Sequence, residues 1–123
     1  MKIKDIGILL FDNVEEMDFC GPFEVLSLTS KLNNNPFNVF TVSTEDTTVK
    51  TAGGLKVLTD YTLRDDINID ILVIPGGIGT RKEMLNENSI EWIKNSYKKC
   101  EYVLTVCTGS LLLGKAGFLD GLD

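Results

Sequence analysis

The sequence predicts an α/β fold, an open and mostly parallel sheet with helices on both faces. Short, near-continuous apolar runs recur along the chain, as is typical of strands that are covered on both faces. Stretches with helical periodicity separate these runs, and turn-forming residues close them. An alternation of strands and helices favours right-handed crossovers between parallel strands.

Four apolar runs are the predicted strands of this sheet. A fifth extended stretch, residues 49–58, is predicted to be a hairpin that turns at Gly53-Gly54. The residues Leu55, Val57 and Thr59 alternate after the glycine pair, as is typical of a strand. The four runs are residues 6–11, 39–43, 71–74 and 102–106.

The first predicted helix covers residues 14–32, which are rich in helix formers, and residues 33–36 (Asn-Asn-Asn-Pro) end it. Pro22 lies inside this stretch. Proline has no N–H to donate to the carbonyl of Asp18, so the helix either kinks at Pro22 or begins there.

Two further helices follow. Ser89 is predicted to cap the first of them, which carries Ile90 and Ile93 on one face. The other begins at Ser110 and ends at a glycine, either Gly117 or Gly121.

The length of 123 residues fits a single domain. The chain stops at Asp123, just after a predicted helix, which is an unusual place for an open sheet to end. We therefore expect residues 1–123 to be one domain that is C-terminally incomplete.

Composition excludes several functional classes. The formal net charge is −6, and no basic cluster exceeds a pair such as Lys98-Lys99, so nucleic acid is not an expected partner of this segment. The apolar runs are too short to cross a membrane, and the N-terminus lacks the layout of a secretory signal, so a cytoplasmic protein is expected.

The three cysteines, Cys20, Cys100 and Cys107, form no C-x-x-C pair, and the sequence has no histidine. An odd number without regular spacing argues against a disulfide framework. A zinc site lacks ligands, and neither a metal nor another cofactor is expected. No Cys-His or Ser-His dyad can form from these residues.

Three segments are predicted to converge where parallel strands end, because ligands bind beyond the carboxyl ends of strands in open sheets. Cys107 follows one strand directly, Gly76-Gly77 follows another, and Asp18 lies a few residues beyond the first.

Cys107 is the predicted nucleophile. With Thr108 and Gly109 it forms half of a nucleophile elbow, although Thr105 stands where the preceding glycine would be. A helix N-terminus behind the thiol is expected to favour the thiolate. The alternative is an inert cysteine buried at a strand end.

The N–H groups of Gly76-Gly77 and of Thr108 are candidate donors to an oxyanion, against the alternative of an ordinary tight turn. Asp18 is the candidate acid or base beside the thiol, or else a solvated or helix-capping carboxylate. Three other carboxylates, Glu15, Glu16 and Glu24, compete with Asp18 for this role. The two remaining cysteines, Cys20 and Cys100, are predicted to be structural.

Three motifs in this order resemble the ThiJ/PfpI superfamily, of the class I glutamine amidotransferase-like (flavodoxin-like) fold. The nearest branch is that of isonitrile hydratases and related sensor domains of transcription regulators. The motifs are residues 17–26 (Met-Asp-Phe-Cys-Gly-Pro-Phe-Glu-Val-Leu), 73–81 (Val-Ile-Pro-Gly-Gly-Ile-Gly-Thr-Arg) and 106–110 (Val-Cys-Thr-Gly-Ser), the last followed by 113–117 (Leu-Gly-Lys-Ala-Gly).

The resemblance implies that Cys107 is the nucleophile, Asp18 its acidic partner and Thr108 a third active-site residue, with Gly77 and Thr108 supplying oxyanion N–H groups. It also implies a homodimer, and further C-terminal strands and helices that this chain lacks. Its implied reaction is hydration of an isonitrile to an N-substituted formamide through a thioimidate on Cys107.

Two functional hypotheses stay open. The first is a cysteine-dependent hydratase or hydrolase that acts on a small electrophile, and other superfamily activities (glyoxalase, deglycase, protease) belong with it. The second is a sensor domain that detects a small molecule or an oxidant through Cys107. A purely structural role would leave the glycine-flanked Cys107 unexplained.

Overall fold

The computed structural model describes residues 2–118. Its main sheet has five parallel strands in the order β5-β2-β1-β6-β7, and a separate antiparallel pair joins β3 to β4. The strands of the main sheet are β1 (Lys4–Leu10), β2 (Phe37–Ser43), β5 (Tyr61–Thr62), β6 (Ile71–Ile74) and β7 (Tyr102–Thr105), and the pair is β3 (Thr48–Lys50) with β4 (Lys56–Leu58).

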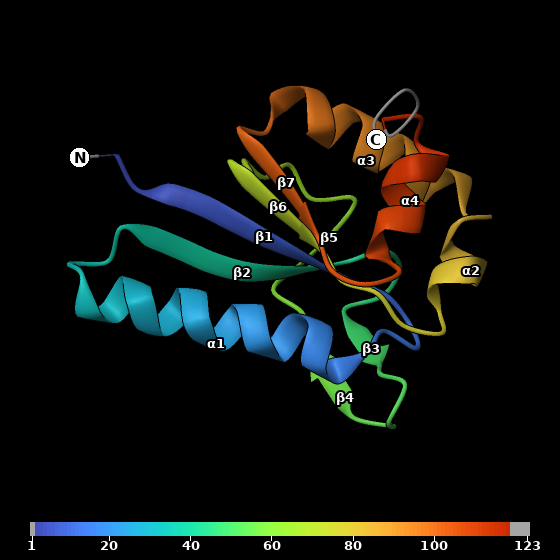
Figure 1. Ribbon diagram of the computed structural model, residues 1–123, viewed down its shortest axis with the longest axis horizontal. Coiled ribbons are helices and arrows are strands. Elements are labelled where there is room, and N and C mark those ends of the chain that lie inside the picture. The colour runs from blue at the N-terminus through green and yellow to red at the C-terminus, as the bar shows by residue number, and fades with distance from the viewer. Residues whose placement is uncertain (1, 119–123) are drawn as a thin grey trace.

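Helices cover both faces of this sheet, which confirms the predicted fold class. The long helix α1 (Glu16–Leu32) lies against β1 and β2 on one face, whereas α4 (Gly109–Lys115) lies against β6 and β7 on the other, next to α3 (Glu87–Lys99) (Figure 1). The short helix α2 (Thr80–Glu83) contacts α4.

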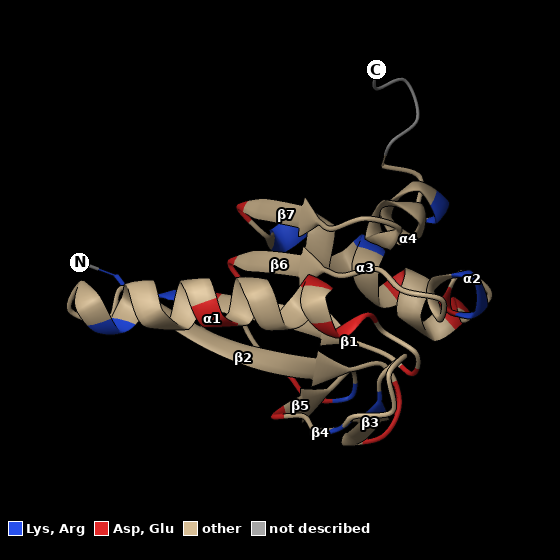
Figure 2. Ribbon diagram, turned by 60° about the horizontal axis from the view of Figure 1, so that its bottom comes forward, with Lys and Arg blue, Asp and Glu red and all other residues tan. Residues whose placement is uncertain are grey.

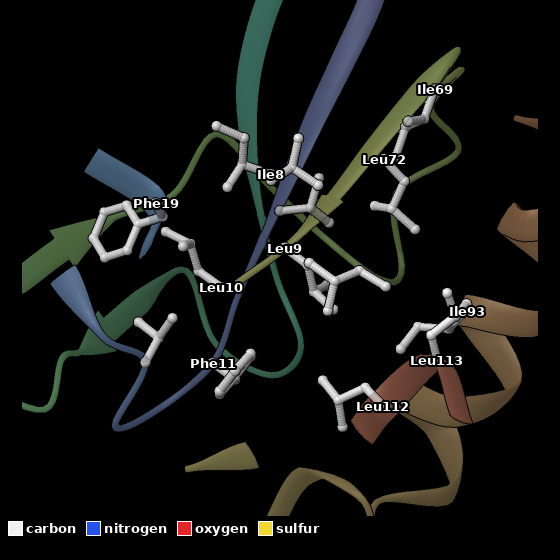
Figure 3. Packing of buried hydrophobic residues seen from close by; sticks show 14 of the residues in the cluster. Ile8, Leu9, Leu10, Phe11, Phe19, Ile69, Leu72, Ile93, Leu112 and Leu113 are labelled. Carbon is white, nitrogen blue, oxygen red and sulfur yellow. The ribbon is translucent and has the colours of Figure 1, made fainter. Parts of the chain in front are cut away.

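The core lies on both sides of β1. Ile8, Leu9 and Leu10 have no solvent exposure, and successive side chains of a strand point to opposite faces, so β1 is covered on both. Figure 3 shows Phe19 of α1 on one side of β1 and apolar side chains of α3 and α4 on the other. The central strand is therefore held in place from both faces.

Helix α1 rules out one of the two alternatives that Pro22 left open, a helix that begins at the proline. It begins at Glu16 and continues through Pro22 to Leu32, so Pro22 does not mark its start. The first turn of α1 therefore precedes the proline and carries Asp18.

Helix α3 begins three residues earlier than predicted. Its N-cap is Asn86, whose side-chain oxygen accepts the N–H groups of Asn88 (3.1 Å) and Ser89 (3.3 Å). Ser89 lies inside the helix, is buried, and donates its hydroxyl to Glu83 Oε2 (2.7 Å). Asparagine and serine both cap helices well, so the residue types alone do not identify the cap.

The last described helix, α4, ends at Lys115, and Gly117 follows with a positive φ of 94°. The alternative end at Gly121 lies outside the described residues. Within residues 2–118, no helix combines the length and the apolar character that crossing a membrane requires.

We expect Asn86→Ala to lower the free energy of unfolding by about 1 kcal/mol, because the substitution removes the side chain that accepts two N–H groups at the start of α3. Urea denaturation followed by circular dichroism measures this loss. Asn88→Ala is the matched control, since Asn88 is exposed and takes part in the cap through its backbone N–H. Equal losses for the two variants would contradict the cap assignment.

Candidate active site

The three predicted segments meet at the carboxyl edge of the sheet. The chain places β2 on one side of β1 and β6 on the other, so the strand order reverses between β1 and β6. Such a reversal leaves a crevice at the strand ends where open α/β sheets bind ligands. Cys107, Gly76 and Asp18 all lie at this position, and the Asp18 carboxylate accepts a hydrogen bond from each of the other two.

Cys107 stands on a strained turn between β7 and α4. Its φ is +50°, in the left-handed region that residues other than glycine rarely adopt. Ser110 Oγ donates to the Cys107 carbonyl at 3.2 Å and closes the turn. A side chain on Gly109 would overlap the carbonyl oxygens of Ile74 and Pro75, so glycine is required where α4 passes the end of β6. The Cys107 side chain is exposed, which excludes the alternative of a buried strand-end cysteine.

Asp18 connects two of the three segments. Its side chain is 9% exposed; Oδ1 lies 3.7 Å from Cys107 Sγ and accepts the thiol proton, whereas Oδ2 accepts the N–H of Gly76 at 3.2 Å. The N–H of Glu15 donates to the Gly76 carbonyl at 2.9 Å, which holds the start of α1 against the end of β6. The position of Asp18 therefore follows from backbone contacts on both sides.

The competing carboxylates lie elsewhere. Glu16 accepts the N–H of Gly53 in the β3–β4 hairpin at 3.0 Å, and Glu24 is exposed on the next turns of α1. Glu15 acts on Cys107 through its charge. Asp18 is the carboxylate that contacts the thiol.

The electrostatic setting of Cys107 differs from the sequence expectation. The charge of Asp18 is the largest of the effects that raise the pKa of the Cys107 thiol above its ordinary value; partial desolvation, the hydrogen bond to Asp18 and the charge of Glu15 act in the same direction. Figure 2 shows acidic residues on the segment that enters α1 and on its first turn. A carboxylate in contact therefore outweighs the seven-residue helix behind the turn, and the pKa of the Cys107 thiol is raised rather than lowered.

Gly77 also has a backbone that only glycine tolerates. Its φ is +133°, and a Cβ there would lie 2.5 Å from the Glu15 nitrogen and 2.6 Å from the Asn13 oxygen. Its N–H donates to Thr108 Oγ1 at 3.0 Å. Because the N–H of Gly76 donates to Asp18, both glycine donors that the sequence suggested for an oxyanion have partners within the protein.

Thr80 is a neighbour of the site that sequence reasoning missed. It begins α2, is fully buried, and its hydroxyl oxygen lies 3.1 Å from Thr108 Oγ1. A helix of four residues is too short to produce a periodic pattern of apolar residues. In the sequence, the glycine-rich turn before Thr80 was the one feature that pointed to this segment.

The other two cysteines are remote from this site. Cys100 is half-buried, donates to the Ile69 carbonyl at 3.3 Å, and has its pKa raised to about 11 mainly by burial, which fits the predicted structural role. Cys20, also predicted to be structural, is exposed on α1, and partial desolvation with the Glu16 charge raises its pKa.

The described residues contain no group of three His, Cys, Asp or Glu side chains placed to hold a metal ion. What residues 2–118 do provide at the strand edge is a thiol, a proton acceptor in contact with it, and a hydroxyl on the next residue. This set of groups suits addition of sulfur to an electrophile with transfer of one proton.

Known proteins are similar to this chain in sequence and in fold. The chain is 34% identical to isonitrile hydratase of Pseudomonas putida over 116 residues, which is 94% of the chain and 49% of that protein. It is 31% identical to deglycase PfpI of Pyrococcus furiosus (94% of the chain, 68% of that protein) and 26% identical to the HTH-type transcriptional regulator GbdR of Pseudomonas aeruginosa (98% and 33%). The chain thus spans about half the length of the hydratase.

A crystal structure of a ThiJ/PfpI family protein from Pseudomonas syringae superposes with a TM-score of 0.84 at 25% identity, and the match covers 98% of this chain and 49% of that one. A family model, the DJ-1/PfpI family, matches residues 4–123. By sequence and by fold, the chain belongs to the DJ-1/PfpI family.

Proposed function

We propose that the protein is a cysteine-dependent hydratase of the isonitrile hydratase type. The observation that carries this proposal is the 3.7 Å contact between Cys107 Sγ and Asp18 Oδ1, on a strained turn that exposes the thiol. Identity of 34% to isonitrile hydratase supports the substrate class. The reaction needs no histidine, and the chain has none.

In the first step, sulfur adds to the isonitrile carbon. As the S–C bond forms, Asp18 takes the thiol proton and delivers it to the same carbon, so R–N≡C becomes the thioimidate R–N=CH–S–Cys107. Proton transfer together with attack suits a thiol whose pKa is raised by the same carboxylate, because a free thiolate is scarce at neutral pH.

In the second step, water adds across the C=N bond, its oxygen to carbon and a proton to nitrogen. The C–S bond of this adduct then breaks, the hydroxyl proton returns to sulfur, and the product R–NH–CHO leaves. Asp18 is the group in contact with sulfur that exchanges these protons. Such a nucleophile needs a reducing compartment, so we place the reaction in the cytoplasm.

The similarity to GbdR favours a second candidate, a sensor domain that binds a small molecule beside Cys107. Both candidates use the same site. They differ in turnover, which the experiments below measure.

Asp18→Asn is expected to speed alkylation of Cys107 by iodoacetamide at neutral pH. The substitution removes the charge that contributes most to the raised pKa of the thiol, so the rate–pH curve shifts to lower pH. Peptide mass spectrometry after brief labelling gives the rate at each cysteine. Cys100, half-buried with a pKa of about 11, is the internal control and reacts more slowly than Cys107 in both proteins. An unchanged curve for Cys107 would show that Asp18 does not set its pKa.

Asp18→Asn is expected to speed alkylation but to slow turnover. Asp18→Asn loses on the order of 10²-fold or more in kcat for an alkyl isonitrile, because an amide cannot exchange the proton. Cys107→Ser loses both turnover and alkylation at that position, whereas Cys20→Ser, an exposed thiol outside the site, keeps wild-type kcat. Formation of the N-substituted formamide is followed by chromatography, with methylglyoxal as a second substrate.

Full turnover by Asp18→Asn would remove Asp18 from the mechanism. A wild-type protein that turns over neither substrate, yet binds a small molecule tightly, would favour the sensor.

We also propose that the chain forms a homodimer. The outward face of α1 carries a stripe of exposed apolar side chains, and its opposite face packs on the sheet. An exposed apolar stripe at helical spacing is typical of an interface. Gly21 lies within the stripe with open space around it, so a second helix can approach closely. The exposed side chains are those of Met17, Val25, Leu28 and Leu32.

Light scattering is expected to give twice the chain mass for the wild type and a shift toward monomer for Leu28→Lys, because a charge in the stripe opposes burial. Leu85→Lys is the matched control, since Leu85 is equally apolar and exposed but lies between α2 and α3. A wild-type monomer over a wide concentration range contradicts the proposal.

A further inference from the structure

Three hydroxyl and amide groups behind the nucleophile form a small network with a defined direction. Thr108 Oγ1 lies 3.0 Å from the Gly77 nitrogen, 3.1 Å from Thr80 Oγ1 and 3.4 Å from the Gly77 carbonyl oxygen. The Gly77 carbonyl already accepts the N–H of Thr80 at 3.1 Å. Hydroxyl groups have one proton and two acceptor positions, so the network can be assigned by counting.

Thr80 determines the direction of this network. Its side chain has 0% exposure, and within residues 2–118 its hydroxyl is hydrogen-bonded to Thr108 Oγ1 alone. A buried hydroxyl proton without an acceptor costs free energy, whereas the exposed Thr108 hydroxyl can use other acceptors. Thr80 is therefore the donor and Thr108 the acceptor.

With this assignment, the Thr108 proton has one partner among residues 2–118, the Gly77 carbonyl 3.4 Å away. Thr108 Oγ1 accepts from the Gly77 N–H and from the Thr80 O–H, which fills both of its acceptor positions. The bond to the Gly77 carbonyl is longer and weaker than an ordinary O–H···O hydrogen bond, so a substrate acceptor at a shorter distance would replace it. Two incoming hydrogen bonds also polarise the Thr108 O–H and make it a stronger donor.

We propose that Thr80 is a positioning residue for Thr108: its buried hydroxyl turns the Thr108 O–H toward the open site, as the donor to the substrate heteroatom next to the carbon that Cys107 attacks. The Gly77 N–H then acts through Thr108 instead of contacting the substrate directly. The role for the substrate rests on the proposed hydratase function, whereas the orientation of Thr108 does not.

Kinetics of the full-length protein test the role. Thr80→Val, close in shape but without the hydroxyl, is expected to lower kcat for an alkyl isonitrile about tenfold and to change KM less than about twofold. Thr80→Ser restores kcat to within about threefold. Thr80→Val added to Thr108→Val gives no further loss, because both act through one proton. Thr62→Val, a buried threonine on the edge strand β5, is the control with wild-type kcat.

Nuclear magnetic resonance tests the orientation without turnover. Three-bond couplings of the Thr108 methyl carbon to its backbone nitrogen and carbonyl carbon are expected to show one χ1 rotamer in the wild type and in Thr80→Ser, and averaging in Thr80→Val. In the wild type itself, the Thr80 hydroxyl proton is expected to exchange slowly with water and the Thr108 proton rapidly.

The outcomes separate the two levels of the proposal. A wild type without isonitrile turnover, but with the expected couplings, overturns the hydratase and leaves Thr80 as the positioning residue. A single Thr108 rotamer in Thr80→Val, or a rapidly exchanging Thr80 hydroxyl proton, overturns the positioning role whatever the activity. An active wild type whose Thr80→Val variant loses affinity in KM and not in kcat overturns it as well.

Discussion

The arrangement of the site depends on one hydrogen bond, from the Gly76 N–H to the Asp18 carboxylate. It joins the loop after β6 to the first turn of α1, and the other oxygen of the same carboxylate receives the thiol of Cys107 at the end of β7. Segments separated by 58 and 89 positions in sequence thus share one buried acid. A carboxylate placed this far from solvent needs such partners, because burying it without them is costly.

The same bond also influences the chemical character of the Cys107 thiol. A carboxylate held beside the sulfur raises the pKa of the thiol, so reactivity toward simple alkylating agents is restrained. In the proposed reaction, the acid that restrains the thiol also accepts its proton as the S–C bond forms. Such a pair favours substrates that take up a proton as sulfur adds to them over substrates that need a thiolate already formed. This preference supports an isonitrile as the proposed substrate.

Much of the fold was predictable because its central strands are short apolar runs that only a doubly covered sheet can bury, as β1 and β6 show. The hairpin was predictable from its glycine pair. By contrast, β5 has two residues and α2 has four, too few for a periodic pattern. These elements form because of tertiary contacts, which local sequence does not report.

The candidate site, like the fold, was predictable only in part. Cys107 and Asp18 were candidates from their place after strands, but choosing Asp18 over Glu15 and Glu16 requires knowing which side of α1's first turn faces β6. The direction of the Gly77 N–H depends on the Thr108 rotamer, which residue types do not determine. The displaced cap of α3 has a similar cause, because two good capping residues lie three positions apart.

The left-handed conformation of Cys107 has a consequence for the evolution of this chain. A residue with a side chain in that region loses on the order of 1 kcal/mol of folding stability relative to glycine, out of a total of roughly 5–15 kcal/mol. Drift toward a more stable domain would therefore favour glycine at position 107 once selection for chemistry ceased. The proposed chemistry at Cys107 is a reason for this chain to carry a cysteine where glycine would be more stable.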